Sequence, residues 1–233
     1  MALTLLLLCL CGCAVTPAYE AGYQPRADGL PAGQAGKPLV VVVHGIFDDG
    51  RKMRPLITFL EEKGYACFAP ELKPGNAYHG IRDLALKLRT EIDAQIGPER
   101  DFAMVGFSMG GLVSRYYLQE LGGAERCRAL VTISSPHRGT LLGYALPSRG
   151  VEEMRPGSDF LESLNSDTSL EPLDGMPVYS YYTPLDLVII PARNSEWARA
   201  ENQRFRALLH PLMVSEQAVL ERLGGDLDQA FGR

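Results

Sequence analysis

The stretch AMVGFSMGGL, residues 103–112, decides the fold of this chain. An apolar run, predicted to be a strand, ends at Ser108, and a segment with helical character begins directly after it. A tight turn from strand to helix brings backbone atoms close to the serine. Side chains at Gly106 and Gly110 would collide with those atoms, so glycine is expected at both positions.

The same stretch has the pattern Gly-x-Ser-x-Gly, which is typical of a nucleophile elbow. In such an elbow the serine hydroxyl is held at the end of a strand, exposed to substrate. The pattern alone is short and could also occur in an ordinary turn. Its position between a strand and a helix favours Ser108 as a nucleophile over a turn serine.

The rest of the chain alternates between predicted strands and helices. LVVVV at 39–43 is a continuous β-branched run, typical of a strand buried on both faces. The predicted strands are 39–43, 65–70, 101–107, 127–134 and 177–183, and the predicted helices are 53–64, 81–92 and 109–121. This order predicts an α/β fold with a mostly parallel central sheet and helices on both faces. Catalytic or ligand-binding residues are then expected at the carboxyl ends of the strands.

A serine nucleophile needs a base, and the base needs an orienting acid. In elbow hydrolases the chain order is serine, acid, histidine, which favours Asp186 as the acid and His210 as the base. Asp186 follows a predicted strand, which supports this role. The alternative is that it only caps a turn after Pro184. His137, after another strand, is a competing base. The remaining candidates are weaker: His44, His79, Asp159, Asp167 and Asp174.

Acyl transfer also needs amide donors for the oxyanion. The amide after the nucleophile belongs to Met109, and an early loop usually supplies the second donor. The turn HGIF, with Ile46 as the expected donor, follows the first strand, and Gly45 would let its backbone approach the substrate. Asp48 and Asp49 are adjacent carboxylates of a turn, which are usually solvated, so we expect no metal site there. We also expect no cofactor.

The N-terminus is expected to be an export signal. Residues 1–13 are strongly apolar but too short to span a membrane, and LCGC ends this segment like a lipoprotein cleavage box with Cys13 as the lipidated residue. Residues 14–37 are rich in Pro, Gly and Ala and predict a flexible linker. The catalytic domain is then expected at 38–233, in the bacterial cell envelope, either lipid-anchored or released as a periplasmic or secreted protein.

The net charge of −5 over 233 residues excludes a general nucleic-acid binder. Cys67 and Cys127 lie in apolar, strand-like runs and are expected to be buried thiols, although a disulfide between them stays open. The segment 141–176 is expected to form a small cap over the site. Its apolar residues are expected either to line an acyl pocket or to pack the cap: LLGYAL, Met154, Phe160, Leu161 and Leu164.

Several motifs together resemble the α/β-hydrolase superfamily: VVVHGIFDD, VGFSMGGLVSRYYL, ISSPHRGT, GSDFLESLN and TPLDLVIIP. More narrowly, they resemble bacterial lipases of the triacylglycerol-lipase type and GPI-inositol-deacylase-like hydrolases. The resemblance covers about Leu39 to His210. It implies an α/β-hydrolase fold with Ser108 as nucleophile, Asp186 as acid, His210 as base, and Ile46 and Met109 as oxyanion donors. It also implies that His44 and His137 are structural.

The function expected from this combination is hydrolysis of carboxylic esters, small or lipidic, through an acyl-enzyme. Fold and triad do not fix the leaving group. Thioesterase, amidase and acyltransferase chemistry therefore remain alternatives, and so does a non-catalytic lipoprotein. An intact set of triad candidates argues against the last of these.

Overall fold

The computed structural model describes residues 36–48 and 50–233. The predicted signal segment with Cys13, and the predicted linker up to residue 35, lie outside the described residues. Within the described part of the chain, no helix is long and apolar enough to cross a membrane.

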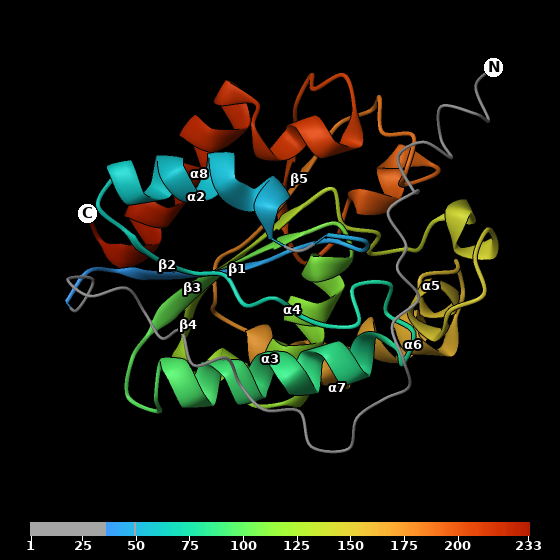
Figure 1. Ribbon diagram of the computed structural model, residues 1–233, viewed down its shortest axis with the longest axis horizontal. Coiled ribbons are helices and arrows are strands. Elements are labelled where there is room, and N and C mark those ends of the chain that lie inside the picture. The colour runs from blue at the N-terminus through green and yellow to red at the C-terminus, as the bar shows by residue number, and fades with distance from the viewer. Residues whose placement is uncertain (1–35, 49) are drawn as a thin grey trace.

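A six-stranded parallel sheet forms the centre of the molecule, in the order β2-β1-β3-β4-β5-β6 (Figure 1). The strands are β1 (Leu39–Val43), β2 (Ala66–Phe68), β3 (Phe102–Phe107), β4 (Cys127–Ile133), β5 (Val178–Tyr182) and β6 (Glu201–Arg204). The elbow strand β3 lies in the interior of the sheet, between β1 and β4. This arrangement confirms the predicted α/β fold with a parallel sheet.

Helices cover both faces of this sheet (Figure 1). On one face lie α2 (Arg54–Glu62) and α8 (Gln217–Phe231), and on the other lie α3 (Ile81–Gln95) and α4 (Met109–Glu120). The five residues of β1 are all buried, and they alternate between the two apolar cores. Leu39, Val41 and Val43 pack with α3 and α4, whereas Val40 and Val42 pack with α2 and α8. Burial on both faces therefore explains the continuous β-branched run.

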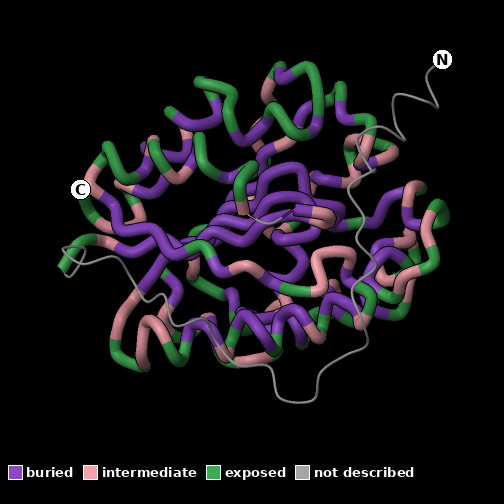
Figure 2. The backbone as a smooth tube through the Cα atoms, in the orientation of Figure 1, coloured by how far each residue is buried: buried purple, intermediate pink, exposed green. Residues whose placement is uncertain are grey.

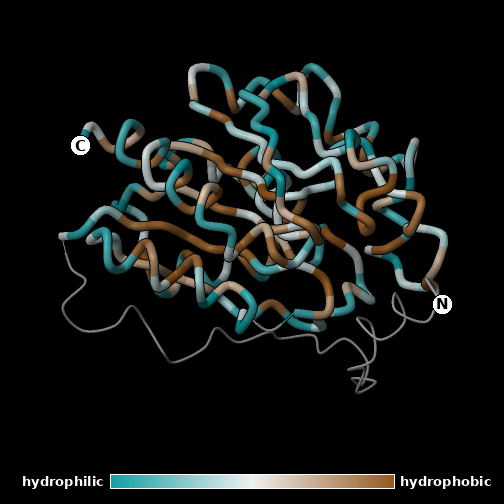
Figure 3. The backbone as a smooth tube through the Cα atoms, turned by 90° about the horizontal axis from the view of Figure 1, so that it is seen from above, coloured by the Kyte–Doolittle hydropathy of each residue, from teal (hydrophilic) through white to brown (hydrophobic). Residues whose placement is uncertain are grey.

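Figure 2 shows this layering as buried strands inside helices whose outer sides are exposed. Seen from above in Figure 3, the strands form apolar tracks through the middle of the molecule. The two cores hold all the predicted strands and helices in place, although the ends of several elements differ by one to three residues from the prediction.

Short helices follow β4, and the first of them lie beyond the carboxyl ends of the strands (Figure 1). These cap elements are η3 (Leu141–Tyr144), α5 (Arg149–Glu153) and α6 (Asp159–Leu164), whereas α7 (Asp167–Leu170) and η4 (Glu171–Leu173) run back along α4. Ser148, Ser158 and Ser166 each precede one of the α-helices and accept a hydrogen bond from its third residue. Serine N-caps therefore stabilise helices too short to be stable by propensity.

Apart from the short cap helices and the 3-10 turns, two elements were not predicted. The edge strand β6 has the polar sequence ENQR and is mostly exposed, so it carries no apolar alternation. The C-terminal helix α8 does carry a helical apolar pattern: Val219, Leu220, Leu223 and Leu227 are buried on one side. That pattern would have revealed the helix from the sequence.

The two cysteines of the described chain are free, buried thiols. Cys67 lies on β2 and Cys127 on β4, and two strands separate them. The strand spacing alone places them roughly 14 Å apart, which is too far for a disulfide. Burial raises the pKa of both thiols to about 12.

Candidate active site

Ser108 stands at the turn between β3 and α4, in a backbone conformation that few residues other than glycine adopt. Its φ is 54° and its ψ is −125°. Its amide donates to the carbonyl of Ile133 at the end of the neighbouring strand, at 2.8 Å, which holds the strained turn against β4. Such strain persists only where the surrounding structure imposes it, and it is common at catalytic residues.

The glycines beside Ser108 leave room for this turn. A Cβ atom on Gly106 would lie 2.6 Å from the Cα of Gly111, and one on Gly110 would lie 2.3 Å from the carbonyl oxygen of Val43. Both neighbours are backbone atoms, which cannot move aside cheaply. The close approach of β1, β3 and α4 therefore requires glycine, as the sequence predicts.

Replacing Gly110 by alanine is expected to destabilise the protein by about 3 kcal/mol or more, because the added methyl overlaps backbone. Gly225 offers a matched control in α8, since a Cβ there meets nothing within 4 Å. Gly225→Ala is expected to stabilise the protein by about 0.5–1 kcal/mol through helix propensity. Urea denaturation of both variants measures the difference. Equal stabilities would contradict the close packing of the elbow.

Asp186 and His210 form a buried hydrogen-bonded pair. The Oδ2 atom of Asp186 lies 2.7 Å from Nδ1 of His210. The other oxygen, Oδ1, accepts hydrogen bonds from the amides of Val188 and Ile189 at 2.8 and 2.9 Å. The carboxylate is therefore fixed from both sides, and it holds the imidazole in one orientation with the proton on Nδ1.

Burial by itself raises the pKa of Asp186, but hydrogen bonding and charge from His210, together with the two amides, outweigh it. The net pKa of Asp186 is lower than the ordinary value. The carboxylate is thus ionised at neutral pH. A carboxyl whose pKa falls on folding stabilises the protein above its unfolded-state pKa, and this stabilisation is lost as the pH falls through the folded-state value.

His210 lies next to the elbow, although it is far from Ser108 in the sequence. Its ring packs against Phe107, the residue before Ser108, with centroids 4.9 Å apart. The hydroxyl of Thr183 donates to the carbonyl of Ala207 at 2.7 Å and so ties the loop after β5 to the segment that carries His210. The structure thereby brings all three predicted triad residues to the carboxyl end of the sheet.

The other buried histidines have both ring nitrogens engaged. Nε2 of His44 accepts from the amide of Leu72 at 3.0 Å, and Nδ1 lies 2.9 Å from the carbonyl of Gly45. His137 contacts Arg115 through Nδ1 and Thr132 through Nε2. Burial and two neighbouring arginines hold the pKa of His137 well below 6.5. Neither ring has a free lone pair for a serine proton.

The HGIF loop lies directly against the elbow. A Cβ atom on Gly45 would be only 3.1 Å from the Cβ of Ser108, so the loop approaches the serine as closely as glycine allows. The amide of Phe47 donates to the carbonyl of Gly75, which leaves Ile46 as the loop's candidate donor to substrate. Met109 is the first residue of α4, where helix amides have no acceptor within the helix.

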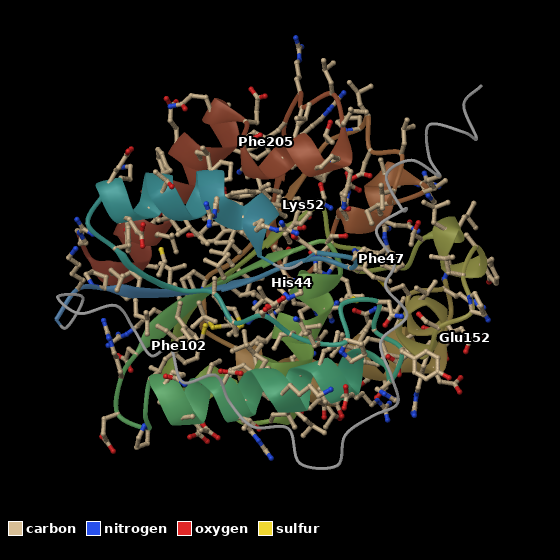
Figure 4. The ribbon with its side chains drawn as sticks, in the orientation of Figure 1. His44, Phe47, Lys52, Phe102, Glu152 and Phe205 are labelled. Atoms are coloured by element: carbon tan, nitrogen blue, oxygen red, sulfur yellow. The ribbon has the colours of Figure 1, made fainter. Side chains whose placement is uncertain are left out.

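A cavity of about 80 Å³ opens beside Ser108, between this loop and the cap. Figure 4 places Phe47 at the end of the sheet that faces the cap, where Glu152 of α5 also lies, whereas Phe102 lies at the opposite end. The lining is almost entirely apolar and comes from η3, α5 and the loop after Asp186. The lining residues other than Ser108 are Ile46, Phe47, Thr140, Leu142, Gly143, Ala145, Leu146, Val151, Met154, Val188 and Ile189.

Both of the roles that the sequence left open for the apolar cap residues therefore occur. Leu142, Leu146 and Met154 line the cavity, but Phe160, Leu161 and Leu164 belong to the buried core instead. Phe160, for example, stacks on Tyr116 of α4. The sequence showed that these residues are apolar, but not which side of the cap they face.

Arg115 is a buried residue that the sequence did not reveal as important. Its guanidinium is fully buried and stacks 3.9 Å above the ring of Trp197. It donates to neutral acceptors on α4, on the loop after β4 and on the cap: Gln119, His137, the carbonyl of Leu164 and Asn165. Burial lowers its pKa to about 9. Arg115 thus fastens the cap to the helix that begins at the elbow.

Comparison with known proteins places this chain in a family. The sequence model described as palmitoyl protein thioesterase matches residues 39–173, which is more than half of the chain. The chain belongs to the palmitoyl protein thioesterase family. No curated protein matches it in sequence.

Solved structures show that this family member has the α/β-hydrolase fold. Est1E from Butyrivibrio proteoclasticus is 14% identical with a TM-score of 0.63, and the match covers 88% of this chain and 93% of that one. Bacillus licheniformis lipase BlEst2 is 18% identical with a TM-score of 0.63, covering 89% and 95%. A thioesterase domain from the curacin biosynthetic pathway is 15% identical with a TM-score of 0.58, covering 81% and 91%. Membership of the palmitoyl protein thioesterase family supports a general serine-hydrolase activity.

Proposed function

We propose that the protein hydrolyses acyl esters through a Ser108–His210–Asp186 triad and an acyl-enzyme. The observation that carries the proposal is the buried Asp186–His210 pair packed against the strained elbow that holds Ser108. A hydrogen-bonded carboxylate and imidazole beside a strained serine are the parts that nucleophilic acyl transfer needs.

In the proposed cycle, the hydroxyl of Ser108 attacks the acyl carbonyl while Nε2 of His210 takes its proton. The carbonyl oxygen becomes an oxyanion, which the amides of Ile46 and Met109 stabilise. The imidazolium, stabilised by Asp186, returns the proton to the leaving group, and the bond to that group breaks. Water then attacks the acyl-enzyme with His210 as base, which releases the carboxylic acid and restores Ser108.

A thioester is a second candidate substrate, and membership of the palmitoyl protein thioesterase family favours it. The proposed cycle is the same for both, because only the leaving atom changes from oxygen to sulfur. The fold supports both candidates equally, since esterases, a lipase and a thioesterase domain are all among the structural neighbours.

The test compares an oxygen ester and a thioester that carry the same hexanoyl group, using the purified protein and its Ser108→Ala variant. Hydrolysis of either substrate that disappears in the variant supports the acyl hydrolase. The ratio of the two kcat/KM values then assigns the leaving group. Hydrolysis that persists in the variant, or the absence of hydrolysis of both substrates, overturns the proposal.

We further propose that Cys13 carries a lipid that attaches the protein to the bacterial cell envelope. The proposal rests on the apolar segment and the LCGC box in the sequence. Mass spectrometry of the mature N-terminus tests it. A lipid-modified Cys13 at the terminus is the expected result, and an unmodified terminus downstream of Cys13 would contradict the proposal.

A further inference from the structure

The cavity beside Ser108 extends from a solvent-exposed rim to a buried wall. Its outer wall contains the exposed Ala145 and the half-buried Leu146. The inner wall is made of three side chains that are almost inaccessible to solvent: Val151, Met154 and Ile189. An acyl chain attached to Ser108 and directed inward would therefore meet these side chains as the end of the pocket.

The short helix α5, which contains Val151 and is followed directly by Met154, is firmly attached to the body of the protein. The amide of Gly150 donates to the carbonyl of Ala77 at 2.9 Å. The carboxylate of Glu153, next to Met154, accepts from the amide of Ile81 at the start of α3. The carbonyl of Met154 itself accepts from the amide of Thr140 at 2.8 Å. Moving this wall would break all of these hydrogen bonds.

The volume of the cavity is small for a long acyl chain. Pockets that hold drug-sized ligands measure about 300–1,000 Å³, whereas this cavity measures about 80 Å³. A palmitoyl group, from which the family takes its name, has sixteen carbons and is comparable in size to such ligands.

We propose that this family member selects acyl groups much shorter than palmitoyl, and that Met154 sets the limit. The inference rests on the proposed acyl-hydrolase function and adds its substrate class. Met154 is an unbranched, flexible side chain that fills the inner end of the pocket. Truncation to alanine removes its thioether and extends the cavity into the space that the side chain occupied.

The test measures kcat/KM for a series of acyl esters with one leaving group, from acetyl to palmitoyl, each below its aggregation concentration or in a fixed detergent. For the wild type we expect the value to fall by about 100-fold or more between octanoyl and palmitoyl esters. In Met154→Ala the ratio of dodecanoyl to hexanoyl turnover should rise by at least 10-fold.

Leu161→Ala is the matched control, because Leu161 is a buried cap residue that does not line the cavity. It should lower stability without changing the chain-length ratio. A flat wild-type profile up to palmitoyl, or an equal shift in both variants, overturns the inference while leaving the acyl hydrolase intact. No hydrolysis at any chain length overturns the proposed function and this inference with it.

Discussion

Ser108→Ala is expected to lower kcat/KM for any substrate of this protein by about 10⁴- to 10⁶-fold. Without the hydroxyl no acyl-enzyme forms, and only binding and the oxyanion donors can still accelerate attack by water. The measurement is steady-state hydrolysis of a hexanoyl ester, followed to the detection limit. A variant that keeps more than about a tenth of the activity would exclude Ser108 as the nucleophile.

The same variant should fold normally. The side chain of Ser108 makes no capping hydrogen bond to α4, so alanine removes no helix cap. Serine and alanine are also similarly strained at a positive φ. Thermal unfolding of the variant is therefore expected to match the wild type within about 0.5 kcal/mol. A large loss of stability would mean that lost activity reports unfolding and not the missing nucleophile.

Asp186→Asn is expected to lower kcat by about 10⁴-fold while the site keeps its shape. An asparagine can still accept from the amides of Val188 and Ile189 through its oxygen. Its NH₂ group then faces Nδ1 of His210 and forces the imidazole proton onto Nε2. A ring protonated on Nε2 cannot accept the proton of Ser108. Steady-state hydrolysis with the hexanoyl ester measures the loss.

Asp226→Asn is a matched control for this variant, because Asp226 is equally buried but bonds to Tyr181 and Arg222 instead of to a histidine. It should reduce stability and leave kcat nearly unchanged. The pH dependence of stability gives a second readout. The wild type loses stability as the pH falls through the folded-state pKa of Asp186, whereas Asp186→Asn lacks this contribution at every pH. If both variants lose activity equally, Asp186 has no special role.

The sequence was sufficient for the parts of the fold that steric and burial rules determine strongly. The run LVVVV predicts β1 because both faces of this strand are buried, and the glycines around Ser108 predict the elbow because backbone atoms occupy the space of their side chains. The chain order of serine, acid and histidine then placed Asp186 and His210 at the same end of the sheet. The structure shows that the two are hydrogen-bonded.

Other features depend on tertiary contacts that no local pattern specifies. The strand β6 is polar because it lies at an exposed edge. The sequence around Arg115 is that of an ordinary surface position of a helix, but in the folded protein the cap buries this side chain. The cap helices did carry a readable signal in Ser148, Ser158 and Ser166, each of which stands at a helix start. Their brevity hid them, since one or two turns show no clear apolar period.

The cap also explains why the acyl pocket was only half predicted. Its apolar residues divide between the cavity and the core, and a sequence of short helices does not show which side faces inward. The attachment of α5 to Ala77 and Ile81 holds Met154 beside the cavity. Specificity in this fold therefore depends on how the cap docks, whereas the chemistry depends on the elbow.

The most direct test of the central claim is to trap the acyl-enzyme. The protein is mixed with an excess of a hexanoyl ester, quenched in acid within milliseconds and digested, and the peptides are analysed by mass spectrometry. The account predicts a hexanoyl group on Ser108 that accumulates before steady state and is absent from Ser108→Ala. An acyl group on another residue, or hydrolysis without any acylated peptide, would contradict it.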